Sequence, residues 1–175
     1  RSKKPTSIAL VVNQNEIFYR LRMPWVRLLR DNGYTVYAVV ANGAWTQQIE
    51  SAGAEYVEWK LSRSGRNPLS EFGSILGLTK ILRRIKPDIV QNFHTKPNIY
   101  APIAAKLAGV PVTVSTVTGL GYTFVNRPGL GPKLAKRANL GMYLFANRLA
   151  NEVAFQNPDD LDLLRSKRGI TASRG

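Results

Sequence analysis

The run Ile8-Ala9-Leu10-Val11-Val12, close to the start of the chain, decides the fold. All five side chains are apolar, whereas a strand with one face in water alternates apolar and polar residues. A short, continuous apolar run is typical of a strand in a parallel sheet that helices cover on both faces. We therefore expect a central strand over residues 7–12, with helices packed on each side of it.

More short apolar runs follow, separated by longer segments with helical spacing of their apolar residues. We expect strands at residues 7–12, 34–41, 55–59, 89–93, 113–116 and 152–156, and helices at about 17–32, 44–52, 69–85, 98–109 and 130–149. Glycines just past three of the helices, at Gly33, Gly53 and Gly109, agree with these boundaries. This alternation predicts an α/β fold, a doubly wound parallel sheet in a Rossmann-like three-layer sandwich.

The domain organisation follows from length and composition. The chain has 175 residues, which fits one domain, and prolines and glycines never cluster enough to indicate a linker. We expect a polar lead-in at residues 1–6 and a single Rossmann-like domain at residues 7–169. Residues 170–175 are expected to form a tail or the start of an interdomain connection.

Composition excludes several classes of protein. Cysteine is absent and histidine occurs once, so disulfides and thiolate or zinc sites are excluded, and we expect no metal and no cofactor. The longest unbroken aliphatic run, Ile8–Val12, is far shorter than the roughly 20 residues that cross a bilayer, which predicts a soluble, intracellular protein.

The charge indicates an anionic partner. There are 25 lysines and arginines against 11 acidic residues, giving a formal charge of +14. The excess is spread along the chain, with 14 basic and 6 acidic side chains in residues 1–87 and 11 and 5 in residues 88–175. The partner should therefore meet the folded surface, and it would be nucleic acid, an anionic membrane or a phosphorylated ligand.

The loops that follow the strands are where chemistry is expected, because ligands of doubly wound sheets bind beyond the carboxyl ends of the strands. The loop after the first strand has no G-x-G-x-x-G fingerprint, which argues against a nicotinamide or flavin dehydrogenase. A P-loop lysine motif and a G-x-S-x-G nucleophile elbow are also missing from the sequence.

Four loop segments carry a specific resemblance to a known family. They are Leu61-Ser62-Arg63-Ser64-Gly65-Arg66-Asn67-Pro68, Lys86-Pro87-Asp88-Ile89-Val90-Gln91-Asn92-Phe93-His94-Thr95-Lys96-Pro97, Thr116-Val117-Thr118-Gly119-Leu120-Gly121-Tyr122 and Phe155-Gln156-Asn157-Pro158-Asp159-Asp160. Over about Lys4 to Arg168, the chain resembles the amino-terminal domain of a family-four, GT-B fold glycosyltransferase. The similar branch is bacterial and builds capsule, exopolysaccharide and lipopolysaccharide sugars on a lipid carrier.

The resemblance implies that the chain is the acceptor-side half of a two-domain enzyme. In that family a hexosyl group passes from a nucleotide sugar to an acceptor, here a polyprenyl-diphosphate-linked saccharide, with retention of configuration and without an essential metal. The nucleotide-sugar donor would bind a carboxyl-terminal domain that this chain lacks, so the chain alone should be inactive. Such an enzyme would be cytoplasmic and peripheral on the inner face of the membrane. Many relatives carry two glycines after the first strand; this loop has none, so no donor contact is implied there.

His94 is the catalytic candidate. It follows the fourth expected strand, where an imidazole can donate a hydrogen bond to the sugar or to a phosphate oxygen near the reacting centre. The alternative is a histidine whose hydrogen bonds are satisfied at the end of a strand.

Lys96 is a candidate for binding a diphosphate, with which it could pair as a point charge; a solvated lysine at a helix start is the alternative. A cation there opposes the helix dipole, which suggests an anion nearby.

The other acceptor-binding candidates are polar or glycine residues in the strand-following loops. They offer amides, cations, hydroxyls or exposed backbone to a diphosphate or a sugar, and ordinary turn formation is the alternative for each. These candidates are Asn13, Gln14, Arg63, Ser64, Asn67, Thr118, Gly119, Gly121 and Tyr122.

A membrane contact is expected on the helix at residues 130–149. One stripe at helical spacing mixes cations with leucines and would lie on an anionic bilayer: Lys133, Arg137, Leu140, Leu144 and Arg148. A second stripe would face the core: Leu134, Ala138, Met142, Phe145 and Leu149. The alternative is that the leucines pack on a neighbouring helix while the cations are only solvated.

Two other functions remain open at the level of sequence. One is a basic module that binds nucleic acid or another polyanion, which the charge of +14 would support. The other is a non-catalytic membrane subunit that recruits a separate donor-binding chain. Because Trp25, Trp45 and Trp59 fall in expected helices or strands rather than in a basic patch, and no recognised binding motif occurs, we expect no nucleic acid.

Overall fold

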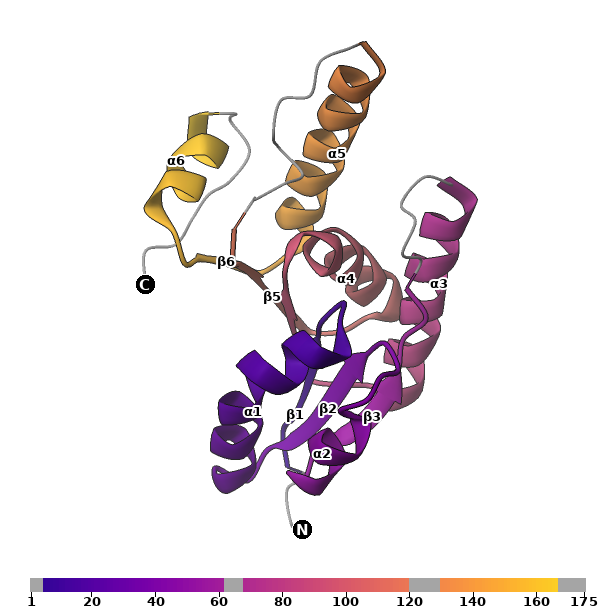
Figure 1. The fold of residues 1–175 in the computed structure, drawn as a ribbon, viewed down its shortest axis with the longest axis vertical. Helices are drawn as coiled ribbons and strands as arrows, with labels where there is room; N and C mark the ends of the chain where they lie inside the picture. Colours follow the sequence, from indigo (N-terminus) through magenta and orange to yellow (C-terminus); the bar gives the residue numbers. More distant parts are fainter. Residues whose placement is uncertain (1–4, 62–67, 120–129, 167–175) are drawn as a thin grey trace.

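The protein forms a six-stranded sheet in which every strand is parallel to its neighbours, in the order β3-β2-β1-β4-β5-β6. A computed structural model describes residues 5–61, 68–119 and 130–166 (Figure 1). The strands are β1 Ser7–Val11, β2 Thr35–Val40, β3 Glu55–Glu58, β4 Ile89–Phe93, β5 Val112–Val117 and β6 Glu152–Phe155. All six expected strands are confirmed, and so is the doubly wound parallel sheet.

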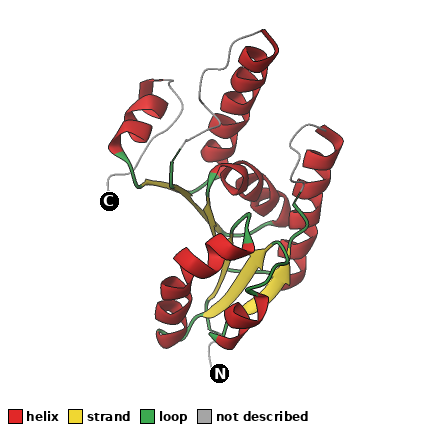
Figure 2. Ribbon diagram, viewed as in Figure 1, coloured by secondary structure: helices red, strands yellow, loops and turns green. Residues whose placement is uncertain are grey.

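Helices connect the strands and cover both faces of the sheet (Figure 2). They are α1 Asn15–Asp31, α2 Thr46–Ser51, α3 Pro68–Ile85, α4 Thr95–Ala108, α5 Leu130–Leu149 and α6 Pro158–Ser166. The five expected helices are confirmed to within a few residues at their ends.

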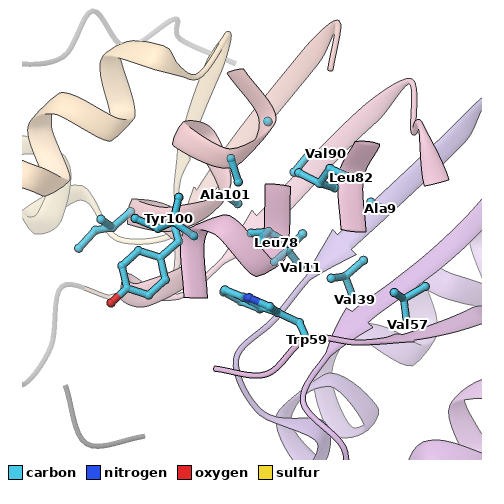
Figure 3. Close-up of a cluster of buried hydrophobic side chains, with 14 of the residues drawn as sticks. Ala9, Val11, Val39, Val57, Trp59, Leu78, Leu82, Val90, Tyr100 and Ala101 are labelled. Carbon is cyan, nitrogen blue, oxygen red and sulfur yellow. The ribbon is translucent and has the colours of Figure 1, made fainter. Parts of the chain in front are cut away.

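The core lies in two layers, one on each face of the sheet. On one face, α3, α4 and α5 pack against alternate strand residues such as Val11 and Val90, and Trp59 fills the space between them (Figure 3). The indole of Trp59 is fully buried and donates to the carbonyl of Ser74 at 3.0 Å. On the other face, α1 and α2 pack against the intervening residues, including Leu10. Burial on both faces explains why β1 is apolar throughout.

The faces of α5 differ from the expected ones. Leu140 and Leu144 are half-buried and pack against the core, so the expectation that they are exposed is wrong, while their contact with a membrane stays a prediction. Met142 and Phe145, expected in the core, are 40% and 56% exposed. The sequence holds two interleaved apolar stripes at helical spacing, and the buried one is centred on Tyr143, whose hydroxyl accepts from Asn98 at 3.3 Å.

The cationic part of that prediction has a mixed outcome. Arg137 and Arg148 are exposed, as expected, and the side chain of Lys133 lies outside the described residues. None of the helices in the described ranges has the length and apolar character needed to cross a bilayer.

The centre of the sheet is the pair β1 and β4. From β1 the chain continues through α1 to β2, whereas from β4 it continues through α4 to β5, on the opposite side. Strand order therefore reverses direction between β1 and β4. In doubly wound folds this switch point opens a crevice beyond the carboxyl ends of the two strands, and ligands bind there.

Candidate functional site

Asn13 and His94 follow the two strands at the switch point. Val11, the last residue of β1, pairs with Asn92 of β4, and Asn13 and His94 each lie two residues further along the chain. His94 immediately precedes α4 and has φ 70° and ψ 164°. This backbone conformation is occupied almost only by glycine and costs a histidine about 1–3 kcal/mol. Strain of this kind is concentrated at functional sites, so His94 is the first residue to consider.

The two ring nitrogens of His94 differ in their contacts. Nδ1 lies 2.9 Å from the Thr118 hydroxyl oxygen, so the structure brings two of the expected site residues together. Nε2 is buried and has no hydrogen-bond partner in the part of the chain that the structure describes. Burial, which is the larger cause, and the charge of Arg22, which is the smaller, lower the pKa of His94 to about 4. The ring is therefore neutral at pH 7. Where the Thr118 hydroxyl donates to Nδ1, the ring hydrogen is on Nε2; where Nδ1–H donates to the hydroxyl, Nε2 is an acceptor.

Arg22 is the residue that sequence reasoning missed. It is only 5% exposed, and its guanidinium carbon lies 3.8 Å from the centre of the Phe93 ring. Within the described part of the chain it makes no hydrogen bond or ion pair, its Nε is buried without a partner, and burial lowers its pKa. A signal existed: Arg22 lies four residues after Phe18 and four before Val26, in the buried stripe of α1.

A polar cavity of about 600 Å³ adjoins the switch point, at the ends of β1 and β2. Asn13, Gln14 and Trp45 are among the residues that line it. The Oδ1 of Asn13 is buried and has no partner among the residues that the structure describes, and Trp45 stacks on Tyr19 with ring centres 4.4 Å apart. The cavity therefore offers an amide oxygen and an aromatic wall, which suit a ligand rich in hydroxyl groups.

Asn15 holds this cavity in shape. Its Oδ1 accepts from the backbone amide of Trp45 at 2.8 Å, and its Nδ2 donates to the Thr46 hydroxyl at 3.2 Å. Gly43 allows the approach, because a β-carbon there would lie 2.6 Å from the β-carbon of Asn15. The loops after β1 and β2 are thus joined by one buried side chain.

Lys96 also lines the cavity, but it has a partner within the protein. Its ammonium group lies 3.2 Å from a carboxylate oxygen of Glu71 on α3. The anion that the position of Lys96 suggested is therefore present as Glu71. Binding of a diphosphate by Lys96 stays a prediction.

The remaining candidates are placed as follows. Gly119 has φ 142°, a conformation that favours glycine, and a β-carbon there would meet nothing within 4 Å. Gln14 is exposed at the cavity wall. Arg63, Ser64, Asn67, Gly121 and Tyr122 lie outside the described residues.

Comparison with known proteins identifies the family. A family model described as "Glycosyl transferase 4-like" matches residues 7–157, which include the whole sheet and the switch point. The chain belongs to this glycosyl transferase 4-like family. The resemblance noted from the loop motifs is thereby confirmed.

Two glycosyltransferases are similar in sequence. One, from Campylobacter jejuni, is N,N'-diacetylbacillosaminyl-diphospho-undecaprenol alpha-1,3-N-acetylgalactosaminyltransferase, 26% identical over 148 residues, which are 85% of this chain and 39% of that protein. The other, from Escherichia coli, is UDP-Gal:alpha-D-GlcNAc-diphosphoundecaprenol alpha-1,3-galactosyltransferase, 39% identical over 59 residues, which are 34% of this chain and 15% of that protein. The chain thus spans well under half the length of either relative.

The fold is shared with solved structures of low sequence identity. UDP-GlcNAc 2-epimerase from Neisseria meningitidis superposes with a TM-score of 0.63 at 16% identity, covering 93% of this chain and 44% of the epimerase. At this identity the similarity concerns the fold alone. It agrees with a Rossmann-like fold, and the chain covers less than half the length of that epimerase.

Proposed function

We propose that this chain is the amino-terminal, acceptor-side domain of a retaining glycosyltransferase. The enzyme would move a sugar from a nucleotide sugar to a saccharide carried on a polyprenyl diphosphate, in the synthesis of cell-surface polysaccharide. The observation that carries the proposal is that both similar glycosyltransferases are named for an acceptor sugar on diphosphoundecaprenol. The family match over the whole sheet supports the same reaction class.

The switch point supports this role chemically. A buried arginine and a neutral histidine are suited to phosphate oxygens, and an unpaired amide oxygen is suited to a sugar hydroxyl. Without an essential metal, the charge that develops on the leaving phosphate must be stabilised by donors held in place by the protein. His94 would donate Nε2–H to an oxygen of the sugar or phosphate at the reacting centre.

The donor would be held by a carboxyl-terminal domain facing this one. Nucleotide-sugar binding, and therefore turnover, would need that second domain. The chain by itself would then bind the acceptor without transferring a sugar to it.

The protein would work at the inner face of the cytoplasmic membrane, where a polyprenyl-linked acceptor is held. The exposed face of α5 supports this placement, because Met142 and Phe145 lie on it with the exposed Arg137 and Arg148. Each cation near an anionic bilayer contributes about 1 kcal/mol to binding at physiological ionic strength.

A transfer assay tests the proposal. The chain alone, and a longer polypeptide that adds the donor-binding domain of the same enzyme, would be incubated with a radiolabelled UDP-sugar and a synthetic polyprenyl-diphosphate saccharide. We expect label in the lipid fraction only with the longer polypeptide, while the chain alone retains the acceptor in a pull-down. Failure of both polypeptides to bind or elongate any polyprenyl-diphosphate saccharide would contradict the proposal.

A further inference from the structure

Arg22 is a buried cation for which the described residues supply no counter-ion. It is 5% exposed and lies against the ring of Phe93, which is itself fully buried. Removing an ion from water costs several kcal/mol unless another charge or strong hydrogen bonds compensate. The Phe93 ring compensates only in part, since a cation–π contact contributes about 2 kcal/mol when desolvated. An anion bound beside Arg22 would remove the remaining cost.

Two further buried polar atoms lie at the same edge of the sheet. The Nε2 of His94 and the Oδ1 of Asn13, just past the ends of β4 and β1, have no hydrogen-bond partner among the described residues. Arg22 is near enough for its charge to contribute to the lowered pKa of His94. Helix α4 starts directly after His94, and no side chain caps its first turn, so the amino end of the helix dipole adds positive potential.

The three groups differ in what they can bind. The guanidinium and an Nε2–H are donors and fit phosphate oxygens, whereas the Asn13 oxygen accepts a hydrogen from a hydroxyl group. His94 is partly exposed as a residue. In the proposed complex its ring would move so that Nε2 meets the ligand. A group that carries phosphate and hydroxyls on neighbouring atoms would satisfy all three.

We propose that Arg22, His94 and Asn13 together form a seat for a glycosyl phosphate, with the phosphoryl oxygens on Arg22 and His94 and a sugar hydroxyl on Asn13. The inference rests on the proposed function and deepens it, because it assigns the phosphate to Arg22, a residue of α1. The phosphate would belong either to the lipid-carrier diphosphate or to the nucleotide sugar. Arg22 would bind it, and its charge would add to the burial that keeps His94 neutral until the anion arrives.

Binding measurements on matched variants test the seat. Arg22→Met removes the buried cation, Arg22→Lys keeps the charge without the forked donors, and Arg27→Met removes an exposed cation from the same helix as a control. Calorimetry with pyrophosphate, UDP and farnesyl diphosphate distinguishes the two sources of phosphate. We expect Arg22→Met to weaken binding of at least one diphosphate by more than tenfold, Arg22→Lys to weaken it less, and Arg27→Met to change it by less than twofold.

The pKa of His94 gives a second, independent readout. Because the chain has one histidine, its imidazole signal in a tag-free sample is unambiguous. We expect the pKa to rise from about 4 toward its ordinary value in Arg22→Met, and to rise in the wild-type protein when the diphosphate binds. If the variant does not fold, the wild-type titration decides the matter alone.

The outcomes separate this inference from the proposed function. Unchanged diphosphate affinity in Arg22→Met, equal losses in Arg22→Met and Arg27→Met, or a wild-type His94 pKa that ligand leaves unmoved would each overturn the seat. Sugar transfer by the two-domain polypeptide carrying Arg22→Met at the wild-type rate would also overturn it, while leaving the proposed function intact. Arg22-dependent diphosphate binding by a protein that transfers no sugar would support the seat and contradict the function.

Discussion

The two ends of the strand pair β1 and β4 are opposite in character. At the amino end, Ser7 and Asp88 bind each other reciprocally: the backbone amide and hydroxyl of Ser7 each donate to an Asp88 carboxylate oxygen at 2.8 Å. The amide of Asp88 returns bonds to the carbonyl and the hydroxyl of Ser7, at 3.0 and 3.2 Å. At the carboxyl end, Asn13 and His94 have buried polar atoms that find no partner within the described ranges.

The difference teaches where the molecule gains stability and where it gives stability up. A buried polar group without a partner costs about 1–3 kcal/mol, and natural proteins keep such groups mainly where a ligand or reaction needs them. The same two strands therefore carry a stabilising end and a functional end. Substitutions at the amino end should affect folding alone, and substitutions at the carboxyl end should affect binding more than folding.

The largest effect is expected for Asp88→Ala at the amino end. The change removes a charged acceptor from two bonds of Ser7, which is only 1% exposed, and should lower the free energy of unfolding by about 3 kcal/mol. Urea denaturation measures the loss. Diphosphate affinity should stay at the wild-type value, and Asp31→Ala, which removes an exposed carboxylate at the end of α1, is the matched control. A stable Asp88→Ala protein with weakened binding would reverse the comparison.

The pH dependence of stability is next in size. The pKa of His94 is lowered to about 4 in the folded chain, so the unfolded chain binds more protons between that value and about 6.5. Stability contributed by the neutral ring is complete above about pH 6.5 and is lost as the pH falls toward 4. We expect a loss of about 1–2 kcal/mol, once solvent screening of this half-buried group is allowed for.

The upper part of this window, between about pH 5 and 6.5, belongs to His94, because carboxylates ordinarily titrate lower and the chain has one histidine. Denaturation curves of the wild type and of His94→Asn, recorded at several pH values in this window, measure how the free energy of unfolding changes with pH. The His94→Asn protein should be insensitive to pH there, and an equal slope in both proteins would refute the assignment.

Backbone strain at position 94 should have a smaller effect on the free energy of unfolding, and it should reverse the usual order of glycine and alanine variants. Alanine ordinarily stabilises a chain relative to glycine, but the φ of 70° and ψ of 164° at this position suit only glycine. His94→Gly should therefore unfold with a free energy about 1 kcal/mol higher than His94→Ala. At Thr95, the first residue of α4, alanine should be the more stable of the two. Equal stability of the two variants at position 94 would mean that the strain is absent.

The smallest effect is expected for Thr118→Val. The variant has nearly the shape of the wild type and loses only the bond to His94 Nδ1, which should lower the free energy of unfolding by about 0.5–1 kcal/mol. The imidazole would then lose the hydrogen bond that orients it, which nitrogen chemical shifts report. Imidazole shifts identical to those of the wild type would show that Thr118 does not orient His94.

Much of the fold could be predicted from the sequence, because short apolar runs and glycine-marked helix ends reflect local structure. Which face of α5 is buried could not be predicted, because its two apolar stripes are equally regular. Only contacts with residues distant in sequence decide between them. Tyr143 is fully buried there, its hydroxyl accepts from Asn98 of α4, and burial raises its pKa to about 12.

The site was predictable in part. Strand-end position and loop chemistry pointed to Asn13, His94 and Thr118, which the structure brings to one edge of the sheet. Arg22 was hidden because an arginine is expected on a solvated face, and the significance of its spacing from Phe18 and Val26 depends on knowing which face of α1 is buried. Glu71 as the partner of Lys96 depends on the packing of α3 against α4, which a single sequence does not specify.

The most direct test of the contrast between the two ends is a chemical-shift titration of the wild-type chain with a polyprenyl-diphosphate saccharide. We predict that the imidazole signals of His94 and the amide of Thr118 shift in proportion to occupancy, while the amides of Ser7 and Asp88 stay in place. Shifts confined to Ser7 and Asp88, or none at His94 when the ligand is bound, would contradict the assignment of function to the carboxyl end.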